Sequence, residues 1–300
     1  MIQKMSEEQP AKNVLSVTEP LRDVRLGYYI HSSSNVPQGF QITVPRSEWF
    51  RAMFIPGNVG PSKAERYPAR IYVLTRDLLI VTSHCDSQER PFITKLSDLV
   101  ELYSHKKEGQ GELVFTGTAQ SPRFCYRPIQ RQSIDTFLFA MRSLWLHSAQ
   151  IRPQEIGWPH QLSHWHRFVL ENELDPGETL VAMLTQSQSE QRRTWPLKGR
   201  SGYQETSFVV LTDRRLMWFK FTEQPGTCPA SVTVRCVPRE RVIKVSANTG
   251  SFQSEGTEVE IVFTPAHRWC LNVKMKQAPS LKALISELSR PSDIGSPHGG

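Results

Sequence analysis

The chain has 300 residues, 38% of them hydrophobic and 22% charged, with a formal net charge of +7 at pH 7. This length suits about two domains of ordinary size, and the composition is that of a globular protein, not of a disordered or fibrous one. The positive charge favours an anionic partner such as phospholipid, nucleic acid or an acidic protein, although an ordinary basic surface has the same composition.

Cysteines and apolar runs narrow the class further. The five cysteines are an odd number without a C-x-x-C pair, so we expect neither a disulfide scaffold nor a zinc knuckle, and a reducing cytosol is the simpler setting. Residues 1–12 lack the apolar core of a signal peptide, and no run approaches the roughly 18 apolar residues of a membrane span. We therefore expect a cytoplasmic protein with no transmembrane segment.

Residues 1–47 are predicted to form an N-terminal arm. Residues 1–20 are polar and lack periodicity, which predicts a flexible, partly disordered segment. Two short extended runs follow, over residues 26–30 and 40–44, broken by Ser, Asn, Pro and Gly. These runs either add an edge strand to the next domain or wrap around it.

A first domain is predicted to follow the arm. Short apolar runs separated by turn residues predict seven strands, over residues 50–55, 70–75, 78–82, 92–96, 99–103, 112–116 and 124–127. The polar stretch 104–111 is predicted to be a loop. After the last strand the period changes, because Ile134, Phe137 and Met141 fall at helical spacing. This spacing predicts an amphipathic helix over residues 130–147.

Residues 149–175 are predicted to be a linker that contains a helix. Prolines and a glycine break the chain first, and residues 160–174 then predict a helix that stops at Asp175-Pro176-Gly177. This helix either locks the two domains together or is an ordinary linker helix. Locking is favoured because Trp165 and Phe168 would otherwise be exposed.

The second half repeats the order of the first. Strands and then a helix are predicted over residues 179–184, 207–212, 215–221, 232–237, 242–246, 258–264, 269–271 and 279–290. The copies share Val-Leu-Thr at 73–75 and 210–212. A spacing of roughly 140 residues indicates duplicated domains, because solenoid repeats are about 20–50 residues long. The domains are predicted over residues 48–148 and 176–292, with a flexible tail over 293–300.

The second and third strands of each copy carry the most specific pattern. It is YVLTRDLL at 72–79 and FVVLTDRRL at 208–216. This pattern resembles the bacterial pleckstrin-homology-like and GRAM-like domains, whose strands carry aromatic-x-Leu-Thr-Asp-Arg-Arg-Leu. The first copy departs from it at Arg76-Asp77, where the acidic and basic residues are exchanged. The resemblance implies a mainly β fold with α, in which two tandem pleckstrin-homology-like domains are each a bent antiparallel seven-stranded sheet or barrel capped by a C-terminal helix.

By the same resemblance, the Leu-Thr-Asp-Arg-Arg hairpin is a structural turn, not a ligand contact. Thr212 and Asp213 would cap the turn through hydrogen bonds between side chain and backbone. Ligand binding is implied instead for the loop between the first two strands, where related domains often hold basic residues for phosphoinositide headgroups.

Both copies have cations in this loop. The residues that we expect at a lipid surface are Lys63, Arg66 and Arg70 in the first copy and Arg192, Arg193, Trp195, Lys198 and Arg200 in the second. Each cation near an anionic membrane adds about 1 kcal/mol of attraction, and a tryptophan suits the interface. The alternative is a solvated basic loop without a ligand.

Two further clusters have residue types that can bind metal or catalyse reactions. His160 and His164 stand at i, i+4 spacing on the predicted linker helix, with His166 beside them, but the H-E-x-x-H pattern of zinc proteases is absent. Residues 83–86 read Ser-His-Cys-Asp. Adjacent residues at a strand end point in different directions, so this run does not form a catalytic pair. We expect a surface or interface histidine cluster and no metal.

The sequence therefore predicts a non-catalytic binding module without a cofactor. It contains no glycine-rich phosphate loop, G-x-S-x-G or dinucleotide fingerprint, and Cys125 and Cys270 are expected to be small core residues. The first candidate function is peripheral association with anionic membrane lipid through the basic loops. The second is a protein-interaction adaptor that binds a peptide strand at the sheet edge beside residues 242–246 and the C-terminal helix. Nucleic acid ranks third, because basic and aromatic residues are not interleaved on one predicted sheet face.

Overall fold

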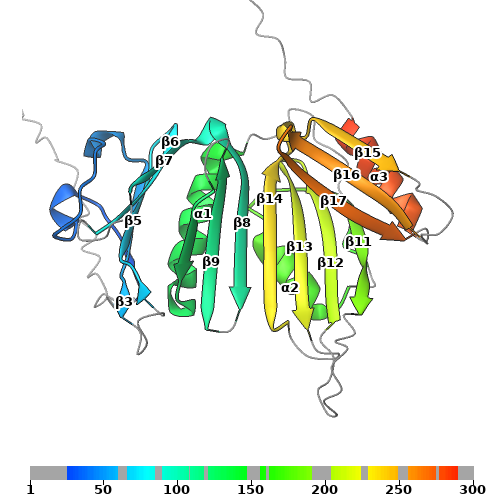
Figure 1. Cartoon of the computed structure of the whole chain (residues 1–300), viewed down its shortest axis with the longest axis horizontal. Helices are drawn as coiled ribbons and strands as arrows, with labels where there is room; N and C mark the ends of the chain where they lie inside the picture. Colours follow the sequence, from blue (N-terminus) through cyan, green and yellow to red (C-terminus); the bar gives the residue numbers. More distant parts are fainter. Residues whose placement is uncertain are drawn as a thin grey trace, which may run out of the picture.

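The computed structural model describes residues 26–59, 66–84, 90–107, 109–117, 121–146, 156–159, 162–190, 204–223, 229–248, 256–274 and 277–289. Over these ranges the protein is mainly β, with three α-helices and antiparallel sheets (Figure 1). None of the sheets closes into a barrel within the described residues. The same ranges contain no helix with the length and apolarity needed to cross a membrane.

The first half arranges its strands in two main sheets and ends in a helix. One sheet has the order β1-β2-β5-β6-β7, a small ribbon pairs β3 with β4, and β8, β9 and β10 are consecutive antiparallel neighbours. The bounds are β1 (Tyr28–Tyr29), β2 (Arg51–Ile55), β3 (Asn58–Val59), β4 (Arg66–Tyr67), β5 (Arg70–Leu74), β6 (Leu78–Ser83), β7 (Phe92–Lys95), β8 (Leu99–Lys107), β9 (Gln110–Gly117), β10 (Arg123–Tyr126) and α1 (Arg131–Trp145).

The second half has the same order of elements. Four strands run β11-β12-β13-β14, three more form a separate sheet β15-β16-β17, and a helix follows. The bounds are α2 (His164–Glu173) in the linker, then β11 (Leu180–Glu190), β12 (Gln204–Thr212), β13 (Arg215–Glu223), β14 (Ser231–Pro238), β15 (Lys244–Asn248), β16 (Gly256–Thr264), β17 (His267–Lys274) and α3 (Ala278–Ser289). A mainly β fold with antiparallel sheets is therefore observed, but the separate seven-stranded sheet or barrel predicted for each half is not confirmed.

Short 3-10 helices turn the chain between several of these elements. They cover Ser33–Asn35, Arg46–Glu48, Leu96–Asp98, Pro128–Gln130 and Arg239–Arg241. The turn at Leu96–Asp98 leads from β7 into β8, and the turn at Arg239–Arg241 leads from β14 into β15. In both copies the chain therefore passes from the first sheet to the second through a short 3-10 helix.

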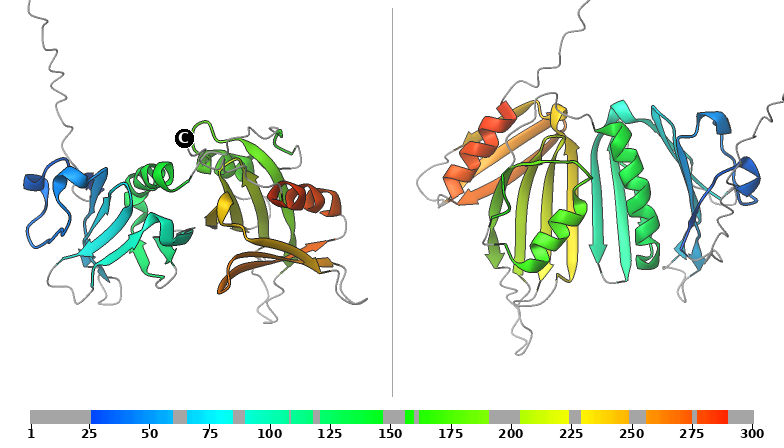
Figure 2. Two further views of the ribbon diagram at one scale, coloured as in Figure 1. Left: turned by 90° about the horizontal axis from the view of Figure 1, so that it is seen from above. Right: turned by 180° about the vertical axis from the view of Figure 1, so that it is seen from behind.

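The two halves share one sheet. β8 of the first half pairs antiparallel with β14 of the second, which gives a seven-stranded sheet of order β10-β9-β8-β14-β13-β12-β11. Figures 1 and 2 show this sheet running across the middle of the molecule, with α1 and α2 lying against the same face of it. This pairing of β8 with β14, called here the inter-repeat joint, lies outside what the sequence predicted.

The predicted loop over residues 104–111 is wrong. Ser104, His105 and Lys106 continue β8, and only Gly109 of the described residues between the strands forms the turn to β9, with φ of +81°. These polar residues are extended because each is paired on both sides, with β9 in the local hairpin and with β14 in the shared sheet. Pairing on both sides outweighs their weak local preference for a strand.

Apolar periodicity explains the helices and the core. Ile134, Phe137 and Met141 of α1 are buried, as the helical spacing predicts. β5 is buried on both faces: Tyr72 contributes to the core beneath α1, and Val73 to a second cluster that includes residues of the 26–49 segment. The N-terminal segment therefore both adds the edge strand β1 and covers the outer face of the first sheet.

The linker helix differs from its prediction in the face that it buries. α2 begins at His164, capped by the Ser163 hydroxyl, which accepts from the His166 N–H at 3.2 Å. His166 and Leu170 are buried, whereas Trp165 and Phe168 are exposed. The helix does connect the halves, but the expectation that Trp165 and Phe168 would be covered is wrong.

Candidate functional site

The inter-repeat joint is held by side chains as well as by the backbone ladder. Glu101 of β8 accepts hydrogen bonds from Arg235 Nη2 at 3.0 Å and from Trp269 Nε1 at 3.1 Å, and His267 Nε2 lies 2.7 Å from its second oxygen. His105 and Thr233 are hydrogen-bonded at 2.8 Å across the same pair of strands. One carboxylate of the first half is thus surrounded by donors of the second.

The environment of Glu101 keeps it ionised. Burial alone would raise its pKa, but hydrogen bonds from His267 and Arg235, together with the positive charge of Arg235, lower the pKa below its ordinary value. The charge of Glu101 therefore contributes to holding the two halves together at neutral pH.

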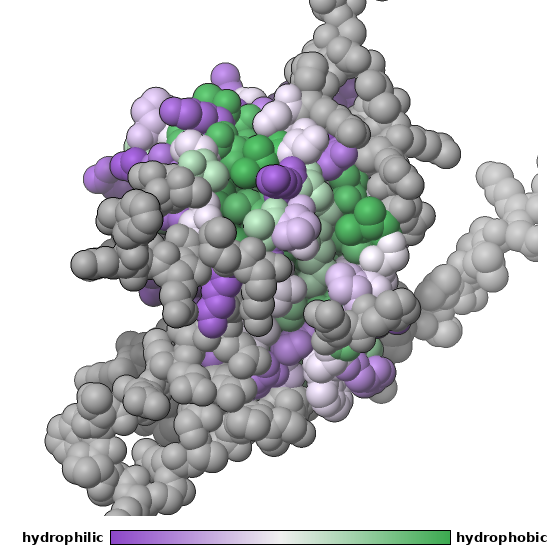
Figure 3. Space-filling view, turned by 90° about the vertical axis from the view of Figure 1, so that its right-hand side faces the viewer, coloured by the Kyte–Doolittle hydropathy of each residue, from purple (hydrophilic) through white to green (hydrophobic). Residues whose placement is uncertain are grey.

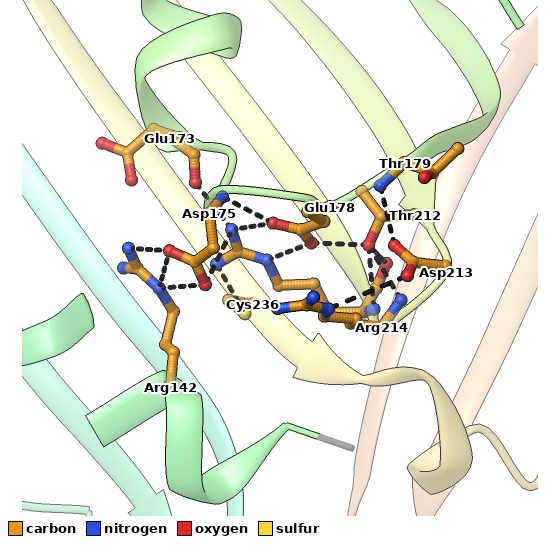
Figure 4. Close-up of polar contacts among 10 residues, drawn as sticks. Arg142, Glu173, Asp175, Glu178, Thr179, Thr212, Asp213, Arg214 and Cys236 are labelled. Atoms are coloured by element: carbon orange, nitrogen blue, oxygen red, sulfur yellow. Dashed lines mark hydrogen bonds and ion pairs between the residues drawn. The ribbon is translucent and has the colours of Figure 1, made fainter. Parts of the chain in front are cut away.

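A second polar cluster lies where α1, the end of α2 and β13 meet (Figure 4). Arg142 binds Asp175 through Nε and Nη2, at 2.7 to 3.1 Å. Arg215 binds Glu178 at 2.7 and 2.8 Å and donates to the Glu173 carbonyl at 2.6 Å. All the charged groups of these two pairs are buried, so the cluster links α1 to the second half through the linker.

Nearby groups complete this cluster. The Lys106 ammonium lies 2.7 Å from Glu173 and 3.1 Å from Asp135. Burial alone would raise the pKa of Glu173, but the positive charges of Lys106 and Arg142 outweigh burial, so the pKa lies below its ordinary value. The Cys236 thiol stands 3.7 Å from Arg215, and burial raises its pKa to about 11, which keeps it protonated and unreactive at neutral pH.

The hairpin turn of each copy is capped as expected. In the first copy, Thr75 Oγ1 accepts from the Asp77 and Leu78 N–H groups at 3.2 and 2.9 Å. In the second, Thr212 Oγ1 accepts from the Arg214 and Arg215 N–H groups at 3.2 and 3.0 Å. The Asp213 carboxylate accepts from the Thr179 N–H at 2.8 Å. The prediction that Thr212 caps the turn is confirmed, whereas the Asp213 side chain binds the Thr179 backbone just before β11 instead of capping the turn.

Several strands stand at the end of a sheet within the described residues. Two of them, β7 in the first half and β15 in the second, have an exposed isoleucine on the strand or immediately before it. Ile93 on β7 is 51% exposed, and Ile243, immediately before β15, is 67% exposed. Figure 3 shows the end of the molecule formed by the second half, with apolar surface gathered in the upper part, where Figure 1 places β15 and α3. The free edge of β15 lies beside α3, in the position predicted from the sequence.

A shallow pocket of about 580 Å³ on the outer face of α1 is a weaker candidate. Its lining includes Ile129, Phe139 and Asp135. The Asp135 carboxylate already lies within 3.1 Å of Lys106 and 3.4 Å of Arg131. No group of three metal-binding side chains occurs in the described parts of the chain. The pocket therefore offers an apolar surface without a polar group prepared for a ligand.

Most of the predicted lipid-binding residues lie outside the described residues. These are Lys63, Arg192, Arg193, Trp195, Lys198 and Arg200. Arg66 is in β4, and the placement of its side chain is not described. Arg70 is buried, lies over the Phe124 ring at 5.1 Å and donates to the Cys125 carbonyl at 3.4 Å. Arg70 therefore has a packing role and presents almost none of its surface to a ligand.

The histidines and the 83–86 run do not form a site within the described residues. His166 is buried, with Nε2 3.1 Å from Glu223, and His164 is exposed on α2. His160, Cys85 and Asp86 lie outside the described residues. His84 packs edge-on against Phe40 at 5.4 Å between ring centres, which is a structural contact.

The expectation that Cys125 and Cys270 are core residues is wrong. Cys270 is exposed and Cys125 is only partly buried. Both stand in the middle of a strand, between neighbours whose side chains are buried. Because successive side chains point to opposite faces of a strand, the cysteines face away from the core.

The residues of the joint and of the second polar cluster were not predicted from the sequence. Glu101, Arg142 and Arg235 were assigned no role, and Arg215 was seen only as part of a turn motif. A signal was present for part of the cluster, because Asp175 and Glu178 bracket the Pro-Gly turn and stand just before the strand that pairs with β12. No single-sequence pattern pairs Glu101 with Arg235.

Comparisons with known proteins add no identification. No protein-family model matches the chain, and the search of curated proteins finds no relative. The free edge of β15 and the charge of the chain are therefore the features that bear on function.

Proposed function

We propose that this chain is a tandem pleckstrin-homology-like, non-catalytic adaptor that binds an extended peptide of a protein partner along the free edge of β15. Each copy has four main strands, then three strands, then a helix, with β1 and the β3–β4 ribbon added in the first copy; four strands, three strands and a helix is the order that this fold requires. The partner strand would lie between β15 and α3, antiparallel to β15, with main-chain hydrogen bonds providing affinity and side-chain pockets providing specificity.

One observation carries this proposal. In the first copy the strand that corresponds to β15 is β8, and its edge already accepts an antiparallel strand, β14, over six residue pairs. The free edge of β15 is therefore the unpaired counterpart of an edge at which strand addition occurs within the same chain. Exposure of Ile243 beside it gives a partner strand an apolar contact.

Peptide selection on the full chain tests this function. A displayed library of random 12-residue peptides is selected on the wild-type chain, and the binding of the selected peptides is compared with that of the Ile243→Lys variant. The matched control is Ile93→Lys, which introduces the same charge at the other exposed edge isoleucine. We expect binding to fall at least tenfold for Ile243→Lys and to persist for Ile93→Lys, with slower amide exchange over residues 244–248. Failure to select any peptide that depends on Ile243 would overturn the proposal.

A second candidate function remains peripheral association of a cytoplasmic protein with anionic membrane. The net charge of +7 and the cluster of Arg192, Arg193, Lys198 and Arg200 around Trp195 favour it. Replacing those four cations with Ser should reduce cosedimentation with phosphatidylserine vesicles, and binding by the wild type should weaken as salt rises. Equal sedimentation of the variant and the wild type would remove this candidate.

A further inference from the structure

The edge strands β7 and β15 are the counterparts of the two strands that pair at the inter-repeat joint. β7 is the fourth main strand of its copy, as β14 is of the other, and each is followed by a 3-10 turn. β15 follows such a turn in the second copy, as β8 does in the first. Each chain therefore has one free edge that corresponds to β14, on β7, and one that corresponds to β8, on β15.

The residue registers make this correspondence specific on the β7 side. Ile80 of β6 lies opposite Ile93, and Met217 of β13 lies opposite Cys236. Ile80 and Met217 occupy the same place after the shared Val-Leu-Thr run, five residues beyond its threonine. Ile93 is thus the counterpart of Cys236.

The register of β15 identifies the counterpart of Ile243 in the same way. Tyr103 lies opposite Val114, and Lys244 lies opposite Val262. Both valines begin a Val-Phe-Thr run, so they correspond to each other. One residue earlier on each strand, Leu102 therefore corresponds to Ile243.

Leu102 and Cys236 are direct cross-strand partners in the joint. Each is buried there, with exposed fractions of 4% and 3%, whereas their counterparts Ile243 and Ile93 are 67% and 51% exposed. The two exposed isoleucines therefore stand at the positions that would meet if the joint were repeated between two molecules.

We propose that copies of this chain associate head to tail, with β15 of one copy pairing antiparallel to β7 of the next and with Ile243 packed against Ile93. This inference rests on the proposed function, because it assigns the partner strand of the β15 edge to a second copy. The contact joins two different surfaces, so every added copy leaves one free edge at each end, and assembly continues into an open chain or closes into a ring.

The composition of the two edges sets the strength of this contact. β7 has four residues where β14 has eight, and Pro91, which lacks an N–H group, precedes it. Lys95 ends β7 and Lys244 begins β15, so the edges repel each other at low salt. Association is therefore weaker than the joint within the chain, depends on concentration, and strengthens as added salt screens the lysines. Membrane attraction has the opposite salt dependence.

Sedimentation velocity on the full chain tests the inference over a range of protein and salt concentrations. We expect species larger than the monomer whose fraction grows with protein concentration and with salt. Ile93→Lys and Ile243→Lys should each weaken association at least tenfold. The control Phe168→Lys, at an exposed apolar residue of α2, should leave it unchanged.

Mixing the two variants identifies the geometry. The Ile93→Lys chain keeps an intact β15 edge and the Ile243→Lys chain keeps an intact β7 edge, so the mixture should form a one-to-one dimer and nothing larger. A wild-type chain that stays monomeric at every concentration would overturn the inference, as would association that only one of the two substitutions affects. If the wild type is monomeric but selected peptides still require Ile243, the self-association fails while the proposed function stands.

Discussion

Removing the carboxylate of Glu178 should destabilise the whole protein. Its side chain is fully buried and lies 2.7 Å from Arg215, which is itself buried. Glu178→Ala leaves the guanidinium in the interior with Asp175, already bound to Arg142, as its remaining acidic neighbour at 3.6 Å. Breaking a buried pair in this way costs about 3–5 kcal/mol, which is a large part of the roughly 5–15 kcal/mol by which a typical domain is stable.

Urea unfolding followed by tryptophan fluorescence measures this cost. With a slope of about 3 kcal/mol per M, the unfolding midpoint should fall by about 1–1.7 M. Glu260→Ala provides a matched control, because the Arg268–Glu260 pair has nearly the same separation of 2.8 Å, but its side chains are 61% and 34% exposed. Exposed pairs contribute about 0–1 kcal/mol, so this variant should unfold close to the wild type.

A double variant separates the lost charge pair from lost packing. Glu178→Leu combined with Arg215→Met removes both charges and keeps apolar volume, so it should recover most of the stability that Glu178→Ala loses. If Glu178→Ala and Glu260→Ala shift the midpoint equally, or if the double variant is less stable than Glu178→Ala, burial does not control the contribution of this pair.

Three other predictions follow from the same contacts. Because the pKa values of Glu101, Glu173 and Glu178 are lowered in the folded state, their contribution to stability is present above the ordinary glutamate pKa and is lost as the pH falls through the lowered values; urea midpoints should be level near neutral pH and decline in acid, and an increase in acid would contradict this. Thr212→Val removes the acceptor of two backbone N–H groups and a donor to a buried carboxylate, so it should cost about 1–3 kcal/mol in the same assay, whereas no loss would show that water replaces the hydroxyl. Gly111→Ala would place a methyl group 2.1 Å from the Tyr126 ring, so this ring must move and the near-ultraviolet circular dichroism should change, while an unchanged spectrum would contradict the close approach.

Local patterns were sufficient to predict most of the elements of this fold. Short apolar runs on either side of a polar pair predicted β5 and β6, and the spacing of Ile134, Phe137 and Met141 predicted α1, because these features depend on neighbours in the sequence. The free edge of β15 also followed from the order of elements.

The joint could not be predicted in this way. Ser104 to Lys107 pair with β9 on one side and with β14 on the other, and β14 begins more than a hundred residues later. Glu101 and Arg235 have ordinary local sequences, so nothing marks them as partners. The face of α2 was also misjudged, because Trp165 and Phe168 have the hydrophobicity of core residues, whereas Leu170 and the paired His166 are the residues that pack.

The sheet shared by the two repeats bears on how the protein can be divided. If the chain were divided anywhere in residues 149–175, β8 and β14 would lie on different fragments. Each fragment would then have an additional unpaired strand edge, and Glu101 would lose its ion pair with Arg235. Strand edges of that kind promote aggregation. Neither half is therefore expected to fold alone, and the intact chain should unfold in one cooperative transition.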